Sequence, residues 1–265
     1  MAFSNLVSRI FGSVASVSFP SSLQAKINEA YVRHFRIDLD EFDEAKNYIS
    51  LNALFTRKLL KPRKLDEGFI SPSDGKILQC GISKSLENEH FALAIKGFTY
   101  SINELLSTAL DEGKREFGYI NIYLSPKDYH RYHAPCDIEI LSVHYVSGAL
   151  FSVDEKHLLK IANLYTRNER FILKCKHNQK IFFLVFVGAL NVGKMNFHFD
   201  ESLKFKAKSG TNFSKNYENL HIKKGEELGY FELGSTIVVI FDKKDLKLRV
   251  SSQDIVKYGQ CIAEL

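Results

Sequence analysis

The sequence predicts an α+β fold in which N-terminal amphipathic helices precede a mainly antiparallel β catalytic domain. Two patterns support this prediction. In the first sixty residues, apolar side chains recur every three or four positions, which is the period of one face of an α-helix. From Tyr119 onward, apolar and polar side chains alternate, which is the period of a strand. We therefore divide the chain into a helical region, 1–60, and a β-rich domain, 61–265.

Three helices are expected in the first region. The first helix carries Phe3, Leu6, Val7, Ile10, Phe11 and Val14 on one face. Pro20 ends that pattern, and Ser21 or Ser22 is placed to cap a second helix carrying Leu23, Ile27, Ala30 and Tyr31. A third helix is expected from about Asp40 through Phe42, Ala45 and Ile49 to Phe55. These helices either pack on the protein's own core or lie in a membrane interface, and the pattern alone favours neither.

Short local signals place elements of the second domain. Asp74-Gly75 is a turn dipeptide that leads into a strand. Ser101 and Glu104 have the spacing of a capping box before Leu105-Leu106, which predicts one more short helix here. Residues 120–124 and 203–207 alternate between apolar and polar side chains, so both are expected to be strands.

Composition restricts the class of protein. The chain has 265 residues, a net charge of +5 and a pI near 8.8, which favours anionic surfaces, whether phospholipid or nucleic acid. Its four cysteines form no C-x-x-C pair, so reduced thiols are expected rather than disulfides or a zinc site. The longest apolar run, which starts at Ile181, is shorter than the roughly 20 residues that a membrane span requires. No signal peptide is recognisable, so we expect a protein that does not cross a membrane.

Residues 57–64 contain five basic side chains in eight positions. Such a run is usually a solvated helix end. It also attracts anionic lipid, at roughly 1 kcal/mol for each basic residue near the surface.

Two motifs resemble ligand sites but fit them poorly. Residues 188–194 match the phosphate-loop pattern G-x-x-x-x-G-K, but Met195 replaces the Ser or Thr that would hold Mg²⁺. The residues after Lys194 alternate as a strand, whereas a phosphate loop is followed by a helix. His130 and His133 have a spacing compatible with metal binding, but no third ligand is nearby, so no metal is expected.

The dipeptide Gly234-Ser235 precedes the apolar run 237–241, which predicts a strand rich in β-branched residues. This dipeptide is either an ordinary turn or a site at which the Ser235 hydroxyl is a nucleophile beside the unhindered Gly234 carbonyl. Asp74, His133 and Ser235 follow one of the chain orders in which catalytic triads occur, although triads are defined by geometry. An α/β-hydrolase would need G-x-S-x-G before a helix, so that class fits poorly.

Eight segments together resemble the phosphatidylserine decarboxylase proenzyme family, in its prokaryotic type. They occur in the family's order at 52–57, 71–77, 96–101, 123–135, 148–153, 167–170, 187–193 and 224–241. Two departures are small: Ser73 stands where the family usually has Ala, and Ile138 stands where Gly is common.

The resemblance implies a self-processing enzyme. Asp74 would orient His133, which would activate Ser235 to attack the Gly234 carbonyl. Cleavage between 234 and 235 would give a β chain, 1–234, and an α chain, 235–265, that begins with a covalent pyruvoyl group made from Ser235. Phosphatidylserine would form a Schiff base with this group and lose CO₂ to give phosphatidylethanolamine. His130 is the first candidate for proton transfer in that step, and His133 the second.

The resemblance also implies partners and a location. The substrate is a lipid, so we expect a peripheral protein on the cytoplasmic side of the cell membrane, bound to an anionic surface and to no nucleic acid. The helical region 1–60 is then expected to be the part that associates with the membrane. Arg131, Arg167 and Arg170 are candidates for contacting the lipid phosphate. The oligomeric state stays open, with a homodimer as one option. Two alternatives remain: a Ser-His-Asp hydrolase that uses intact Ser235, and a non-catalytic lipid-binding protein of the same fold.

Overall fold

The computed structural model describes eleven parts of the chain. These are residue 15 and residues 17–86, 89–93, 99–107, 116–153, 160, 163–189, 195–207, 210–232, 235–243 and 246–265, with only the backbone described at 85–86, 89–93 and 99. The helix expected at 3–14 lies outside the described residues.

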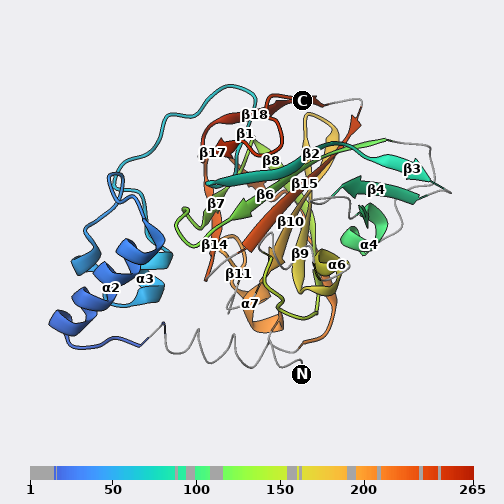
Figure 1. Cartoon of the computed structure of the whole chain (residues 1–265). Coiled ribbons are helices and arrows are strands. Elements are labelled where there is room, and N and C mark those ends of the chain that lie inside the picture. Colours follow the sequence, from blue (N-terminus) through green and yellow to red (C-terminus); the bar gives the residue numbers. More distant parts are fainter. Residues whose placement is uncertain are drawn as a thin grey trace.

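The body of the protein is a nine-stranded antiparallel sheet (Figure 1). Its strands are β2 (Gly75–Ile82), β6 (Phe117–Leu124), β8 (Ile138–Val146), β9 (Arg170–His177), β10 (Lys180–Gly188), β12 (Phe213–Asn216), β13 (His221–Ile222), β15 (Ser235–Asp242) and β17 (Ile255–Val256). They lie in the order β12-β8-β9-β10-β15-β6-β2-β17, and β13 pairs with β8. The strand that Ser235 begins is therefore central in the sheet.

Three smaller sheets surround the large one. The first contains β7 (Arg131–His133), β11 (Met195–Phe197) and β14 (Glu227–Phe231). The second contains β1 (Phe69–Ile70), β16 (Lys247–Leu248) and β18 (Cys261–Glu264). The third contains β3 (Lys84–Leu86), β4 (Glu89–Leu93) and β5 (Thr99–Ser101). The first small sheet carries the segment that follows His130, so its packing on the large sheet determines where the histidines lie.

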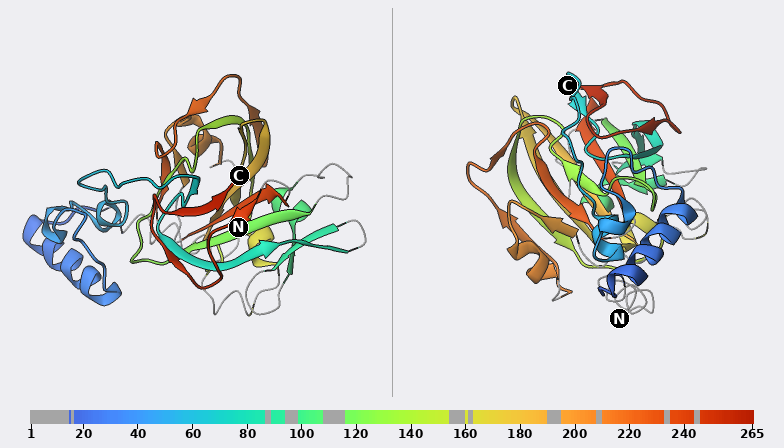
Figure 2. Two further views of the ribbon diagram at one scale, coloured as in Figure 1. Left: turned by 90° about the horizontal axis from the view of Figure 1, so that it is seen from above. Right: turned by 90° about the vertical axis from the view of Figure 1, so that its left-hand side faces the viewer.

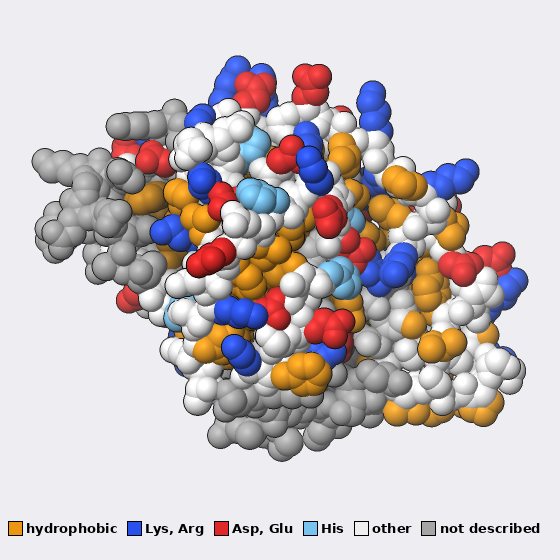
Figure 3. Space-filling model, turned by 180° about the vertical axis from the view of Figure 1, so that it is seen from behind, with side chains coloured by type: hydrophobic (Ala, Val, Ile, Leu, Met, Phe, Trp, Pro, Cys, Tyr) orange, Lys and Arg blue, Asp and Glu red, His pale blue; other side chains and the backbone are white. Residues whose placement is uncertain are grey.

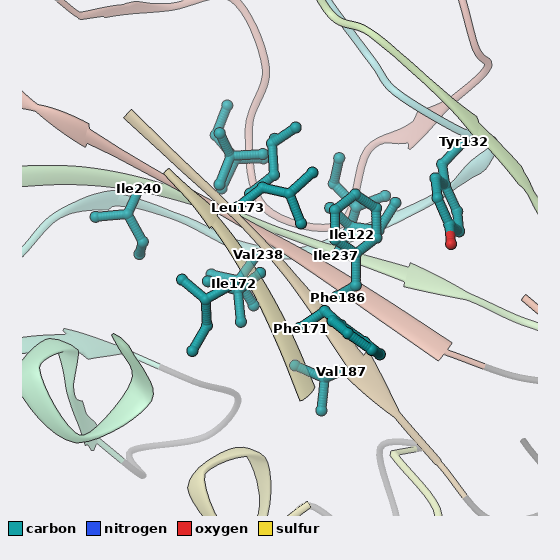
Figure 4. Packing of buried hydrophobic residues seen from close by; sticks show 14 of the residues in the cluster. Ile122, Tyr132, Phe171, Ile172, Leu173, Phe186, Val187, Ile237, Val238 and Ile240 are labelled. Carbon is teal, nitrogen blue, oxygen red and sulfur yellow. The ribbon is translucent and has the colours of Figure 1, made fainter. Parts of the chain in front are cut away.

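The central strands are buried on both faces, which explains their nearly continuous apolar sequences. Ile237 pairs with Ile122 on one side and with Phe186 on the other, so these three side chains share a face of the sheet (Figure 4). Tyr132 of β7 packs on Phe186 at a centroid distance of 4.5 Å. Ser235 is two residues before Ile237 and therefore faces the same layer.

The opposite face of the sheet packs against two short helices, α4 (Ile102–Leu106) and α6 (Leu164–Arg167). The side-chain amide of Asn121, on β6, donates to the hydroxyl of Tyr165, on α6, at 3.1 Å. Ser101 caps α4 by accepting a hydrogen bond from the Glu104 amide at 3.3 Å, which confirms the capping interaction predicted for this helix.

The N-terminal helical elements are α2 (Ser21–Phe35), the 3₁₀ turn η1 (Ala45–Asn47) and α3 (Leu51–Phe55), and they lie to one side of the sheets (Figures 1 and 2). The second predicted helix is confirmed by α2, but its predicted serine cap is wrong because Pro20 is the N-cap and no side chain caps the helix. The third predicted helix is interrupted. The chain is extended at Tyr48, and Ser50 caps a new helix by accepting from the Ala53 amide.

One predicted strand is wrong. Residues 203–207 belong to the helix α7 (Ser202–Ala207), in which only Leu203 is buried. The Asp200 carboxylate accepts hydrogen bonds from the backbone and hydroxyl of Ser202, which favours a helical turn there. Leu, Lys and Ala are good helix formers, so five alternating residues were too few to distinguish strand from helix.

The strand predicted at 120–124 is confirmed by β6, and the turn at Asp74-Gly75 leads directly into β2. The residues after 194 form the strand β11, as expected, which argues against a phosphate loop; residues 190–194 are not described. No helix in the described part of the chain is long and apolar enough to cross a membrane. The mixed architecture confirms the α+β class.

Candidate active site

Ser235 is the first residue of β15, where it pairs with Gly188 of β10 and with Leu124 of β6. It is 0% exposed, and its Oγ has no hydrogen-bond partner among the described residues. Leu233 and Gly234 lie outside the described residues. A buried hydroxyl without a partner costs on the order of 1–3 kcal/mol, so a functional reason for it is expected.

Asp74 lies at the same end of the large sheet as Ser235. β2 and β15 both run antiparallel to β6, so their first residues are at the same end. Tyr123 of β6 pairs with Thr236 on one side and with Lys76 on the other. Asp74 is therefore two strands away from Ser235. The spacing between neighbouring strands alone separates the backbones of these two residues by about 10 Å.

The loop that carries Asp74 also contacts the histidine segment. The Pro72 carbonyl accepts a hydrogen bond from the backbone amide of His133 at 2.8 Å. The hydroxyl of Ser73 is 2.7 Å from the Tyr129 carbonyl oxygen and 3.0 Å from that of Arg131. Ser73, one of the two departures from the family pattern, thus stabilises the contact between the two segments.

Both ring nitrogens of His133 have partners. Nδ1 lies 2.9 Å from the Gly225 carbonyl oxygen, which only accepts hydrogen bonds, so Nδ1 carries the proton. Nε2 is therefore the basic atom, and it accepts a hydrogen bond from the Tyr129 hydroxyl at 3.0 Å. Burial lowers the pKa of His133 to about 4, so the imidazole is neutral at pH 7 and its Nε2 lone pair is available.

Asp74 makes no hydrogen bond to His133 in the described structure. Its carboxylate accepts hydrogen bonds from Arg63, at 2.5 and 3.0 Å, and from the backbone amide of Tyr258 at 2.7 Å. Arg63 also binds Glu41, and this interaction lowers the pKa of Glu41 to about 2. No hydrogen bond joins Asp74, His133 and Ser235 to one another within the described chain, so the predicted triad is not linked in this state.

His130 is fully buried and lies 3.9 Å from the ring of Phe55, centroid to centroid. Its Nδ1 donates to the Asp128 carbonyl at 2.8 Å, so Nε2 carries the lone pair. Nε2 is buried without a hydrogen-bond partner in the described structure. Burial lowers the pKa of His130 to about 3, which keeps this ring neutral as well.

The segment 167–170 supports the strand end that holds Ser235. Asn168 is fully buried and binds both backbone groups of Phe151, while its amide nitrogen also donates to the Gly188 carbonyl at 2.8 Å. Gly188 is the residue that pairs with Ser235. The role of Asn168 was not predicted from the residues themselves. The only signal was that segment 167–170 matches the family pattern.

Two of the three arginines considered for lipid phosphate serve structural contacts instead. Arg131 is buried, forms an ion pair with Glu227 and donates to the Thr56 carbonyl at 2.8 Å. Arg170 is buried and donates to backbone carbonyls of Leu105, Thr166, Asn168 and Glu104. Arg167 is exposed and lines an open hollow of about 630 Å³ together with Glu104, Ser107, Asn163 and Thr166.

The described residues contain no cluster of three or more His, Cys, Asp or Glu side chains that could hold a metal ion. All four cysteines are free. The functional groups in this region are therefore the buried hydroxyl of Ser235 and the two neutral imidazoles.

These features define a class of protein: an α+β protein in which a buried serine without a described hydrogen-bond partner begins a central strand, with one buried histidine on the neighbouring small sheet and a second just before it. The family model for phosphatidylserine decarboxylase matches residues 51–264. The chain is 56% identical to a phosphatidylserine decarboxylase proenzyme of Campylobacter jejuni over the full length of both chains. It is 46% identical to that of Helicobacter pylori, over 100% of this chain and 98% of the relative.

A more distant relative is the mitochondrial phosphatidylserine decarboxylase proenzyme of Rattus norvegicus, 32% identical over 98% of this chain and 72% of the relative. The chain belongs to the phosphatidylserine decarboxylase family.

Proposed function

We propose that this protein decarboxylates phosphatidylserine to phosphatidylethanolamine and CO₂, after cutting itself between Gly234 and Ser235. Membership of the decarboxylase family, with 56% identity over the whole chain, is the observation that carries the proposal. The enzyme is a carboxy-lyase made as a precursor.

Self-cleavage uses residues of the chain alone. Ser235 Oγ attacks the Gly234 carbonyl carbon, and the peptide C–N bond breaks as the nitrogen gains a proton, which leaves an ester. Elimination then removes the α-proton of residue 235 and breaks its Cβ–Oγ bond, which frees the β chain with a Gly234 carboxylate. Water hydrolyses the remaining enamine, in its imine form, to a ketone and releases ammonia.

His133 is the proposed base for the Ser235 proton, and its tautomer identifies Nε2 as the accepting atom. Nε2 has one lone pair, which the Tyr129 hydroxyl occupies in this state. The Tyr129 hydroxyl must therefore turn away, or pass on its own proton, when the imidazole is protonated. Asp74 would act without touching the imidazole.

Residue 235 fits a ketone in place of a serine. Ser235 Oγ makes no hydrogen bond to a described residue, so removing this oxygen atom would break no hydrogen bond within the described structure. The pyruvoyl group so formed would supply an electron sink for the pair left behind when CO₂ departs. The remaining part of 235–265 would stay anchored, because β15 is paired along its length with β10 and β6.

His130 is the proposed proton carrier of the decarboxylation. Its Nε2 is unprotonated and has no described partner, so it can take a proton from the substrate's ammonium group. It can return that proton to carbon after CO₂ has left. Burial keeps this ring neutral, so its Nε2 lone pair is available when the substrate enters the site.

The surface of α2 supports docking on a membrane containing phosphatidylserine. Its buried residues are polar: Gln24 donates to Asn28, whose side chain donates to the carbonyls of Ala45 and Tyr48. Apolar side chains before and within the helix are exposed, namely Val17, Phe19 and Leu23. A helix with polar contacts inward and apolar groups outward is typical of an interfacial helix.

Intact-mass analysis of the full chain tests the proposal. We expect two fragments, the smaller being 235–265 and lighter by one ammonia than a peptide that begins with serine. Ser235→Ala should remain one chain and release no CO₂ from carboxyl-labelled phosphatidylserine vesicles. Ser214→Ala, at an exposed serine on β12, should cleave like the unmodified chain. An uncut chain with esterase activity would instead support the hydrolase, and an uncut inert chain the lipid-binding protein.

A further inference from the structure

Tyr258 lies against the face of the His133 ring. The two ring centroids are 3.7 Å apart and the planes differ by 16°, which is a stacked arrangement. The Tyr258 hydroxyl donates to the Gly225 carbonyl at 2.8 Å, the same oxygen that accepts from His133 Nδ1. One side chain therefore fixes both the plane of the imidazole and the acceptor that determines its tautomer.

Tyr258 is in turn fixed by Asp74. Its backbone amide donates to Asp74 Oδ1 at 2.7 Å, and this contact is buried. The adjacent turn is closed by the Gln260 amide, which donates to the Lys257 carbonyl at 3.1 Å, and by the Gln260 side chain, which accepts from the Lys257 amide at 2.7 Å. The ring of Tyr258 thus has little freedom to leave the imidazole while Asp74 holds its backbone.

We propose that Tyr258 is a positioning residue for His133, and that Asp74 acts on the imidazole through Tyr258 rather than by a direct hydrogen bond. The proposal rests on the self-cleavage proposed above, with His133 as its base. Tyr258 belongs to 235–265, whereas Asp74 and His133 precede the cut. The contact therefore also links the two chains of the processed enzyme.

The surroundings of His133 determine how its basicity responds to a change at Tyr258. The rings of Tyr129 and Tyr258 exclude water from it, while three charged groups face it: Glu227 of β14, Arg131 of β7 and Arg63 of the segment after α3. Burial is the largest cause of its lowered pKa. Removing the ring of Tyr258 should admit water and raise that pKa toward the ordinary histidine value of about 6.5.

The test measures the first-order rate of self-cleavage of newly synthesised full chains across a pH series. The base is active when neutral, so the rate should fall as pH drops through the pKa of His133. Tyr258→Leu should slow cleavage about tenfold or more, as expected for a displaced catalytic group, and move the midpoint of the pH profile upward. Tyr258→Phe keeps the stacking and the backbone amide, so it should restore most of the rate and the original midpoint.

Tyr217→Leu is the matched control, because Tyr217 is a partly buried tyrosine whose hydroxyl donates to Asp200, outside this site. It should cleave with the original midpoint. If Asp74 acts through Tyr258, Asp74→Ala combined with Tyr258→Leu should be no slower than the slower single variant.

Additive losses in the double variant would overturn the indirect role of Asp74. A midpoint unchanged in Tyr258→Leu would overturn the positioning role, whether or not the rate falls. If the unmodified chain itself stays uncut, the proposed function fails rather than this inference.

Discussion

At the residue scale, the two histidines share a hydrogen-bonding arrangement that their spacing in the sequence does not reveal. In each ring Nδ1 donates to a backbone carbonyl, of Gly225 for His133 and of Asp128 for His130. Each ring is buried, and burial lowers both pKa values below the ordinary value for histidine. The difference lies at Nε2, which is occupied by Tyr129 in His133 and has no described partner in His130.

This difference predicts separate roles for the two rings. His133→Ala should abolish self-cleavage, because it removes the proposed base for the Ser235 hydroxyl. His130→Ala should cut normally but lose decarboxylation by about 100-fold or more, the usual contribution of general acid–base catalysis. Gel analysis of the two chains and CO₂ release measure the two reactions separately. His221→Ala, at an exposed histidine, should affect neither. Normal turnover in His130→Ala would reject its role.

At the scale of elements, close backbone contacts hold the sheet end at which Ser235 lies. A Cβ on Gly148 would be 2.5 Å from the Arg167 carbonyl oxygen, so only glycine lets these segments approach. Ala149 and Arg167 then join by a backbone hydrogen bond, and Asn168 reaches Phe151 and Gly188. The segment 167–170 therefore connects the loop at 148–153 to the end of β10.

Asn168→Ala should consequently disturb Ser235 from a distance. The change removes the hydrogen bonds of Asn168 to the backbone of Phe151 and Gly188, one of which is buried, so the free energy of unfolding should fall by about 1–3 kcal/mol. Self-cleavage should also slow, because Gly188 pairs with Ser235. Thermal unfolding in a Ser235→Ala background measures the first effect, and the cleavage rate measures the second. Asn216→Ala, at an exposed position on β12, serves as the control. Unaltered cleavage in Asn168→Ala would contradict the support role.

At the scale of the whole molecule, charge does not by itself select a membrane-facing surface. On the face in Figure 3, basic and acidic side chains are interspersed around hydrophobic groups. Of the five basic residues in 57–64, Arg57 is buried and donates to the Lys127 and Asp128 carbonyls, and Arg63 binds Asp74. The exposed apolar side chains beside and on α2 are therefore a stronger basis than charge for the proposed docking surface.

Replacing Phe19 and Leu23 together by Ser should weaken binding to vesicles containing phosphatidylserine. These side chains are 40% and 47% exposed, and burying apolar groups of this size in lipid contributes on the order of 1 kcal/mol each, so the affinity for vesicles should fall by about 30-fold. Vesicle co-sedimentation measures the affinity. Self-cleavage should be unchanged, and Ile255→Ser, at an exposed position on β17, should bind normally. Equal binding by the double variant would exclude this surface as the docking site.

The sequence by itself determined the features that depend on neighbours along the chain. The apolar run after Ser235 predicted the central strand β15, and the spacing of Ser101 and Glu104 predicted the cap of α4, because burial on both faces and capping leave local patterns. The pattern failed at 203–207, where an Asp200 turn and good helix formers overrode five alternating residues. The resemblance supplied Asp74, His130, His133 and Ser235, but not their partners.

Only the tertiary structure decided those partners. Tyr258 and Gly225 reach His133 because β17 pairs beside β2 and β14 pairs with β7, and these pairings join segments far apart in the chain. Which nitrogen of a histidine carries the proton depends on such long-range contacts, and so does its burial. The spacing of His130 and His133 in the sequence is therefore compatible with a metal site, with a catalytic triad and with a proton carrier. The surroundings of each ring in the folded chain distinguish these three roles.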